Sequence, residues 1–137
     1  MSDKVLFDTN LWIYLYSKAP EEKYAKVDAL LSAKIRSLIV STQVLGELYN
    51  VLIKKKFRTQ PQAQDIIAQL VAGFDILEVD AAKVLKALEI NARYHYSYWD
   101  SLLIATAMQS GCSVLYSEDM QHNQLVEDKL KIVNPFA

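Results

Sequence analysis

The chain has 137 residues, of which 52% are hydrophobic and 23% charged, a composition that excludes a disordered chain and suits a domain with its own core. Its formal net charge of −1 excludes a nucleic-acid binder that relies on bulk positive charge. A single cysteine excludes an internal disulfide, and the few glycines and prolines are scattered, so we expect residues 1–137 to form one domain. The start of the chain lacks the layout of a signal peptide and acids interrupt the long apolar stretches, so we expect a cytoplasmic protein without a membrane segment.

Short apolar runs alternate with segments of helical spacing through the first half of the chain. Residues 5–7 are strand formers that stop at the acid Asp8, as a buried strand does at its carboxyl end. Ser41 or Thr42 follows a second such run and could cap the next helix. The predicted elements are a strand at 5–7, helices at 11–16 and 21–33 separated by Pro20, a strand at 38–40, and a helix to about Lys55.

The same alternation continues through the second half. Pro61 suits the first turn of a helix that Gly73 would end. The later predicted elements are a strand at 76–79, a helix opened by Asp80, a very apolar helix at 98–109 stopped by Gly111, a strand at 114–116 and a short strand at 132–133. Strands that alternate with helices predict an α/β fold with a mainly parallel central sheet of about five strands, flanked by helices on both faces.

Four acids fall where such a sheet binds ligands, which is outside the carboxyl ends of its strands. Asp8 directly follows the first strand, and Asp119 lies just past the fourth. Glu47 lies at the edge of the buried face of the helix after the second strand. Asp100 shares a helical face with apolar residues such as Leu103, where an isolated charge is costly, so it should be paired, protonated or metal-bound.

Each acid also has an ordinary structural explanation. Asp8 could be a helix N-cap, and Asp100 could complete a capping box opened by Ser97. Glu47 could be a half-exposed helix residue and Asp119 a turn acid, and for these two taken singly the ordinary explanation is favoured. Capping does not explain why four acids fall at rim-facing positions of successive elements.

The sequence offers these acids few local counter-charges. No Lys or Arg lies within four residues of Glu47, Asp100 or Asp119, and only Lys4 lies that close to Asp8. All-oxygen ligation suits the hard divalent cations Mg²⁺ or Mn²⁺, which can activate a water and steady the leaving oxygen of a phosphate ester. The acids therefore predict a metal site that acts on phosphate oxygens.

Charge arithmetic is compatible with a polyanionic substrate. Without the four acids, 15 basic and 12 acidic residues remain, so a metal-loaded rim need not repel a nucleic acid. The cluster "KKKFR", residues 54–58, could contact a nucleic-acid backbone. A solvated helix C-terminus with favourable dipole interactions explains the cluster somewhat better.

Four motifs in order resemble those of the PIN-domain ribonucleases, and most of all the VapC-type toxins of bacterial and archaeal toxin–antitoxin pairs. They are "LFDTN" after the first strand, "ELYNVL" on the helix after the second, "YWDSLLIATA" on a late helix and "YSEDMQHNQ" after the fourth strand. The resemblance covers essentially the whole chain. Each motif alone is weak, but four in order with family-like spacing are specific.

The resemblance implies roles for particular residues. The family's acid two residues after a Ser or Thr corresponds to Asp119 and not to Glu118, and Asn123 stands where relatives often have glycine. Asparagine tolerates a left-handed backbone, so we expect that loop to be kept. The family's acidic metal-binding and catalytic quartet falls on Asp8, Glu47, Asp100 and Asp119, with Asn10 and Ser117 as supporting polar residues.

The resemblance also implies a PIN-like domain that cleaves RNA phosphodiesters with Mg²⁺ or Mn²⁺. It implies a homodimer, inhibited by a cognate antitoxin protein whose tail enters the acidic groove. Eight tyrosines, several of them bunched at residues 94–98 beside Trp99, favour a partner surface and core packing about equally. The same acids would also serve a DNA-directed nuclease or a phosphatase.

A receiver-like signalling module is an alternative of another class, since it too is an α/β domain that binds Mg²⁺. It requires an acidic pair after the first strand and a phosphate-accepting Asp after the third. Here Asp8 is followed by Thr9 and Asn10, and Asp80 has the position of a helix cap, so the receiver interpretation is disfavoured.

Overall fold

The structure is a computed structural model that describes residues 3–137 as one α/β domain with a six-stranded sheet. The strand order is β3-β2-β1-β4-β6-β5, and every pairing is parallel except that of β5 with β6. In chain order the elements are β1 (Val5–Phe7), α1 (Thr9–Ser17), α2 (Glu21–Lys34), β2 (Leu38–Ser41), α3 (Thr42–Lys54), α4 (Gln60–Gly73), β3 (Asp75–Leu77), α5 (Ala81–Tyr94), α6 (Tyr98–Gln109), β4 (Val114–Tyr116), β5 (Leu125–Val126) and β6 (Leu130–Val133).

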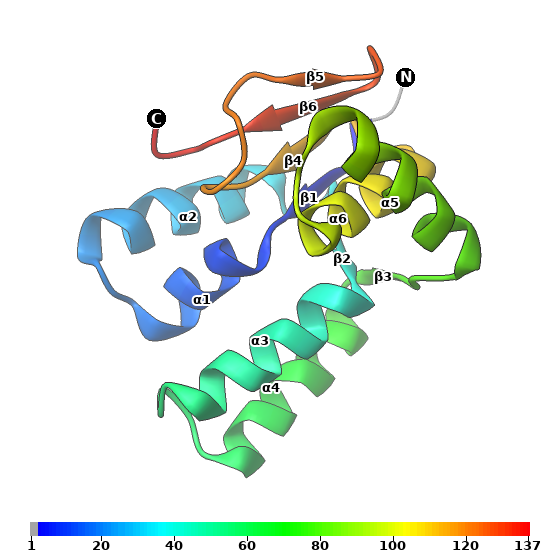
Figure 1. Cartoon of the computed structure of the whole chain (residues 1–137). Helices are drawn as coiled ribbons and strands as arrows, with labels where there is room; N and C mark the ends of the chain where they lie inside the picture. Colours follow the sequence, from blue (N-terminus) through cyan, green and yellow to red (C-terminus); the bar gives the residue numbers. More distant parts are fainter. Residues whose placement is uncertain (1–2) are drawn as a thin grey trace.

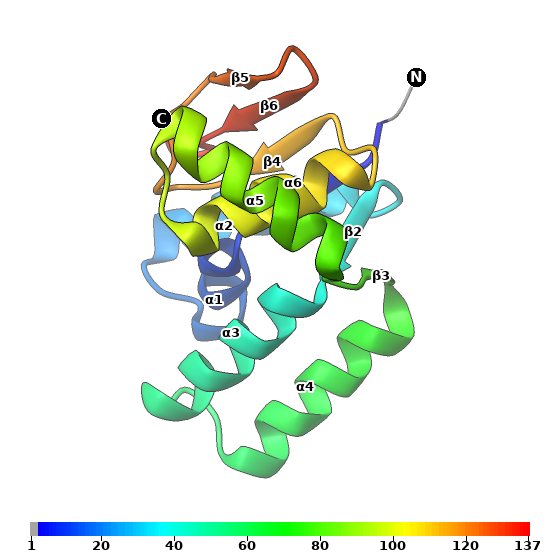
Figure 2. The ribbon, with the colours of Figure 1, turned by 45° about the vertical axis from the view of Figure 1, so that its right-hand side comes forward.

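The helices cover both faces of the sheet, as the sequence predicted. Figures 1 and 2 show α1 and α2 on one side of the central strands and α5 with α6 on the other, while the α3–α4 hairpin extends beyond the ends of β2 and β3. The three residues of β1 are all buried because this strand lies in the middle of the sheet with helices on each face. None of the helices in residues 3–137 combines the length and apolar character that crossing a membrane requires.

The predicted helix boundaries are largely confirmed by side-chain caps. The hydroxyl of Ser41 accepts a hydrogen bond from the backbone N–H of Val44 at the start of α3, and α4 ends at Gly73. The Asp80 carboxylate accepts from the N–H of Lys83, so this residue is the cap that the sequence indicated. Asn123 has a φ of 63°, which is the left-handed conformation expected where relatives have glycine.

The strands differ from the prediction at one edge of the sheet. The sequence predicted about five strands, whereas the sheet has a sixth, β5, of only two residues. Three residues, 127–129, join β5 to β6, and they contain a turn with positive φ at its two central residues, Glu127 and Asp128. Such turns are usually recognised by Asn-Gly or Asp-Gly, so "ED" gives no signal for the hairpin. The third strand also lies one to two residues earlier than predicted, over Asp75–Leu77.

The strand order bears on the receiver alternative. A receiver-like sheet has the order 2-1-3-4-5, which places its third strand beside its first. Here β1 pairs with β2 and β4, and β3 lies at the edge of the sheet. The receiver topology is therefore excluded.

Most of the bunched aromatic side chains pack inside the molecule. Tyr94 and Tyr96 are partly buried against the main core, and Tyr98 packs on a smaller cluster formed by Ala87, Leu102 and Ala105. Trp99 is different, because 61% of its surface is exposed. Core packing thus accounts for the tyrosines of this segment but not for the tryptophan.

Candidate functional site

A cleft of about 680 Å³ opens at the carboxyl edge of the parallel strands, where residues of α1 and α3 line it. All four acids that the sequence singled out line it, although they come from the end of β1, from α3, from α6 and from the loop after β4. The complete lining is Asp8, Thr9, Asn10, Ile13, Glu47, Asn50, Val51, Ile53, Lys54, Asp100 and Asp119. We call this site the acidic cleft.

Asp8 lies at the junction of strand and helix, where it caps α1. Its Oδ1 accepts a hydrogen bond of 2.7 Å from the N–H of Thr9, and its Oδ2 accepts one of 2.9 Å from the hydroxyl of Ser117. Because Phe7 is in register with Tyr116, the residues that follow these two strands are neighbours. Asp8 is thus both an N-cap and a cleft residue, so the two explanations do not exclude each other.

The electrostatics of Asp8 are those of a carboxylate kept from water near other acids. Burial, followed by repulsion from Asp100 and Glu47, raises the pKa of Asp8 to about 6, although the hydrogen bonds from Ser117 and Thr9 oppose this rise. A proton or a cation bound to this carboxylate offsets the unfavourable free energy of burying its negative charge near other acids.

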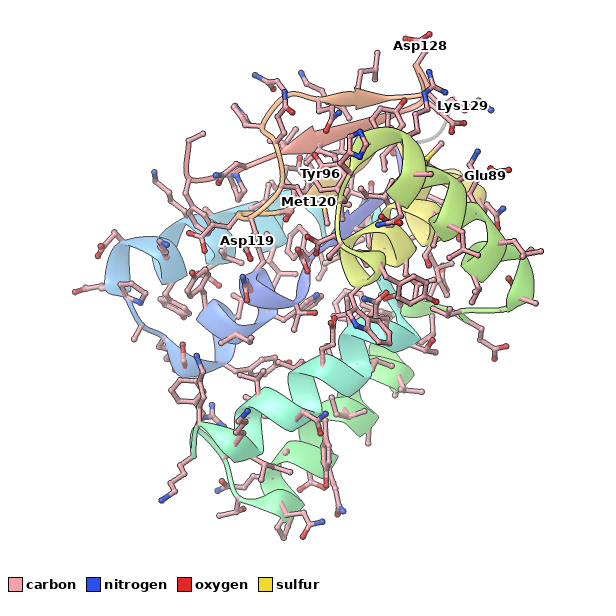
Figure 3. All side chains as sticks on the ribbon, viewed as in Figure 1. Glu89, Tyr96, Asp119, Met120, Asp128 and Lys129 are labelled. Atoms are coloured by element: carbon pink, nitrogen blue, oxygen red, sulfur yellow. The ribbon has the colours of Figure 1, made fainter. Side chains whose placement is uncertain are left out.

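The two residues after Asp8 hold two of the other acids. The hydroxyl of Thr9, on the buried first turn of α1, donates to Oε1 of Glu47 at 2.7 Å. The amide of Asn10 donates to Oδ2 of Asp119 at 2.8 Å. Figure 3 shows Asp119 in the loop after β4, facing α1. The segment "DTN" therefore supplies one acid and the donors that position two more.

The contact of Thr9 with Glu47 was not predicted from the sequence. Asn10 and Ser117 were named as supporting residues by resemblance, and both contact an acid of the quartet. Thr9 stands between Asp8 and Asn10 in the same motif, so its polar character was visible but its direction was not.

Asp100 completes the group from the first turn of α6. Burial and repulsion from Asp119 and Glu47 raise its pKa, while a hydrogen bond with Ser97 opposes the rise. The hydroxyl of Ser97 also accepts from the backbone N–H of Asp100, so the predicted helix cap is present as well. The carboxylates of the cleft are therefore close enough to repel one another.

No cation of the protein neutralises these acids within the described residues. The ion pairs found in residues 3–137 join Lys23 to Glu118, Lys83 to Asp80, and Lys86 to Glu89 and Glu127. The first of these explains why Glu118 differs from its neighbour Asp119, since Glu118 is turned away from the cleft toward Lys23 and Tyr14.

The donor set fits a hard divalent cation, because carboxylate oxygens from four elements line one cleft and, among the described residues, none of them is in an ion pair with a lysine or arginine. As they stand, no three His, Cys, Asp or Glu side chains in residues 3–137 are placed to hold a metal ion between them. Mg²⁺ is commonly bound through one or two carboxylates and keeps several waters, so its binding does not require a closed protein cage.

Fold and site together define an α/β domain with an acidic cleft at the carboxyl edge of its sheet. The chain belongs to the PIN-domain family, whose model matches residues 5–127. No curated protein matches the sequence.

Solved structures resemble the chain over most or nearly all of its length. A toxin–antitoxin complex from Klebsiella pneumoniae has a TM-score of 0.74 at 18% identity, over 96% of this chain and 98% of that chain. VapC20 from Mycobacterium tuberculosis, described as a sarcin–ricin loop cleaving toxin, has 0.68 at 21% identity, over 82% and 87%. A DNA-bound VapBC complex from Salmonella typhimurium has 0.69 at 17% identity, over 95% and 96%. At these identities the likeness establishes the fold.

Proposed function

We propose that the protein is a divalent-metal-dependent endoribonuclease and the toxin of a toxin–antitoxin pair. The observation that carries this proposal is the convergence of Asp8, Glu47, Asp100 and Asp119 on one open cleft, where none of the four forms an ion pair with another described residue. Membership of the PIN-domain family supports it, since PIN-domain nucleases generally use divalent metal ions. The fold shared with VapC20, which is described as cleaving an RNA loop, supports RNA as the substrate class.

The metal-binding role falls on the four carboxylates. A bound Mg²⁺ or Mn²⁺ supplies a Lewis acid that lowers the pKa of a water and stabilises charge on phosphate oxygens. Burial and mutual repulsion raise the free energy of the ionised carboxylates of Asp8 and Asp100 when no metal is bound. Binding of a cation would lower it, which supports a metal-binding role. We assign this role to Asp8, Glu47, Asp100 and Asp119.

Three polar side chains orient the carboxylates from outside the group. Ser117 and the N–H of Thr9 fix the two oxygens of Asp8, the Thr9 hydroxyl holds Glu47, and Asn10 holds Asp119. Each bond leaves other lone pairs of the carboxylate free for a cation, because a carboxylate accepts about four hydrogen bonds. Such outer contacts fix ligand orientation in metal sites.

Cleavage of RNA by the purified protein tests this proposal. We expect cleavage with Mg²⁺ or Mn²⁺, none with chelator, and a large loss on Asp8→Asn or Asp100→Asn. Single-stranded DNA and a simple phosphoester, assayed in parallel, separate a ribonuclease from a DNA-directed nuclease or a phosphatase. RNA cleavage that persists in both variants would overturn the assignment of the acids.

The proposed partners are a second copy of the chain and a cognate antitoxin. The solved complexes that share the fold support the antitoxin, since they are toxin–antitoxin and VapBC assemblies. Light scattering on the purified chain tests for a homodimer. Co-expression with the protein encoded next to its gene tests the antitoxin, which should co-purify and suppress RNA cleavage. A monomer, or a neighbour that neither binds nor inhibits, would contradict these assignments.

A further inference from the structure

The acidic cleft extends beyond the region of its four carboxylates, because further residues of α3 line it. Glu47, Asn50 and Lys54 are spaced three and four residues apart, and all three line the cleft. This spacing places them on one face of the helix. Because an α-helix rises 1.5 Å per residue, Lys54 lies about 10 Å along the axis from Glu47. The cleft therefore has an acidic end and, along α3, a basic end.

Lys54 has no protein partner in residues 3–137. It is exposed, and the ion pairs of the described residues use Lys23, Lys83 and Lys86 instead. Arg58, in the same basic cluster, is already engaged, because its guanidinium donates to the backbone carbonyl of Tyr16 at 2.9 Å. Among the described residues that line the cleft, Lys54 is also the single cation.

Uncharged side chains, three of them apolar, also line the cleft. Ile13 from α1 and Val51 and Ile53 from α3 line the cleft together with the polar side chain of Asn50. These side chains offer contacts to sugars or unstacked bases, but they offer no positive charge to a phosphate. A phosphate that leaves the acidic end therefore next meets a positive charge at Lys54.

We propose that Lys54 binds a backbone phosphate of single-stranded RNA whose scissile phosphate lies at the carboxylates, a role that rests on the proposed function. A stacked strand advances about 3.4 Å per nucleotide and an unstacked strand advances further, so the bound phosphate is roughly one to three nucleotides away. Lys54 is thus a positioning residue that sets the register of the strand in the cleft. It acts on the backbone and selects no base.

The ordinary role of Lys54 is electrostatic support for the C-terminus of α3, since it lies in the last turn of that helix. Lys55 shares this role, because it is the C-cap residue, but it does not line the cleft. Lys54→Gln and Lys55→Gln are therefore matched variants. Both alter the helix terminus by one charge, and only the first removes a charge from the cleft.

Binding measured as a function of salt tests the contact without any need for cleavage. The probe is an about 12-nucleotide single-stranded 2′-O-methyl RNA, read by fluorescence anisotropy with Mg²⁺ present. Each phosphate contact on a single strand contributes about 0.7 to the slope of log K against log salt. We expect Lys54→Gln to lower the slope by about 0.7 and to weaken different sequences equally, whereas Lys55→Gln keeps the wild-type slope. Unchanged slopes, equal losses in both variants, or no binding by the wild type would overturn the proposal.

A cleavage experiment locates the phosphate. A single neutral methylphosphonate is moved stepwise along an RNA substrate, and kcat/KM is measured at each position. In the wild type and in Lys55→Gln we expect a loss when the neutral linkage lies one to three nucleotides from the cleaved bond, and in Lys54→Gln that loss should vanish. If the wild type cleaves no RNA but its salt slope still falls in Lys54→Gln, the proposed ribonuclease activity is wrong, whereas the contact between Lys54 and a phosphate is retained.

Discussion

Glu118 and Asp119 are consecutive acids in the loop after β4, yet they belong to regions of opposite character. Glu118 joins what we call the Lys23 cluster, which consists of Lys23, Tyr14, Glu118 and Phe136: it accepts hydrogen bonds from Lys23 and Tyr14, and Lys23 lies over the rings of Tyr14 and Phe136 at 5.1 and 5.3 Å. Asp119 faces the acidic cleft, where its contact is the neutral amide of Asn10. Among the described residues, Glu118 forms an ion pair with a lysine and Asp119 forms none.

The carboxyl pKa values of the two regions shift in opposite directions. In the Lys23 cluster burial raises the pKa of Glu118, but hydrogen bonds from Lys23 and Tyr14 outweigh it, and the net shift is downward. In the acidic cleft burial and repulsion raise the pKa of Asp8 and that of Asp100. Ionised Glu118 therefore stabilises the fold, whereas ionised Asp8 destabilises it in the absence of metal. Acids with raised pKa values in a cleft are typical of functional sites, which agrees with the proposed function.

The largest expected effect is on cleavage and separates the two regions most clearly. Asp8→Asn keeps the shape of the side chain and its capping oxygen but removes the charge of a proposed metal ligand, and on that proposal it costs several kcal/mol of transition-state stabilisation. We expect kcat/KM for RNA to fall by about 10²- to 10⁴-fold. Glu118→Gln, the matched change in the Lys23 cluster, should leave cleavage within a few-fold of wild type. Equal losses in both variants would show that the regions do not differ in function.

The second prediction concerns stability and pH in the metal-free protein. The pKa of Asp8 is about 6 in the folded chain and near 3.8 in the unfolded chain, so the folded state binds its proton more tightly. This contribution to the free energy of unfolding is absent above the folded pKa and grows as pH falls from about 6 to about 4. It amounts to about 3 kcal/mol. Thermal melting with chelator should therefore show Asp8→Asn to be more stable than wild type at pH 7 and not at pH 4.

Divalent ions supply the control for this pH experiment. On the proposed function, Mg²⁺ or Mn²⁺ competes with the proton at the carboxylates and stabilises the folded state by mass action. We expect millimolar Mg²⁺ to raise the melting temperature of the wild type at pH 7, and to raise that of Asp8→Asn by less. If the melting temperature of the wild type changes neither with Mg²⁺ nor with pH, the acidic cleft does not differ electrostatically from the Lys23 cluster as described.

The third prediction concerns the donors that orient the acids. Thr9→Val keeps the size of the side chain and removes the hydroxyl that holds Glu47, so we expect RNA cleavage to fall by about 10- to 100-fold, as for other outer contacts in metal sites. A double-mutant cycle with Glu47→Gln measures the coupling. If the two losses simply add, Thr9 acts independently of Glu47 and the hydrogen bond does not position that acid.

Much of the fold was predictable because local signals agreed with its global arrangement. The helix 98–109 and the strand 114–116 have the bounds that their apolar patterns indicated, since Ser97 and Gly111 mark the helix ends chemically. Strand order carries no such local signal. That β1 lies between β2 and β4, which brings Asp8 beside Ser117, follows from packing of the whole sheet.

The site was predictable as a set of acids but not as a set of contacts. Placement of Asp8 and Asp119 at strand ends put them at one rim, because parallel strands share a carboxyl edge. The direction of Thr9 toward Glu47 depends on how α1 packs against α3, and so does the position of Lys54 in the cleft. One-dimensional spacing gives the face of each helix but not the neighbour that this face meets.

The smallest expected effect lies in the Lys23 cluster itself. Glu118→Gln removes the charge that pairs with Lys23, but partly exposed ion pairs contribute little because solvent screens them. We expect a small fall in melting temperature at pH 7, smaller than the rise from Asp8→Asn.

The pH dependence of this effect is opposite in sign to that of Asp8. The stability that ionised Glu118 provides is present above its unfolded pKa and is lost as pH falls through its lower folded pKa. The difference in melting temperature between Glu118→Gln and wild type should therefore shrink in acid. A Glu118→Gln protein that is stabilised at pH 7, as Asp8→Asn should be, would show that the neighbouring acids share one environment.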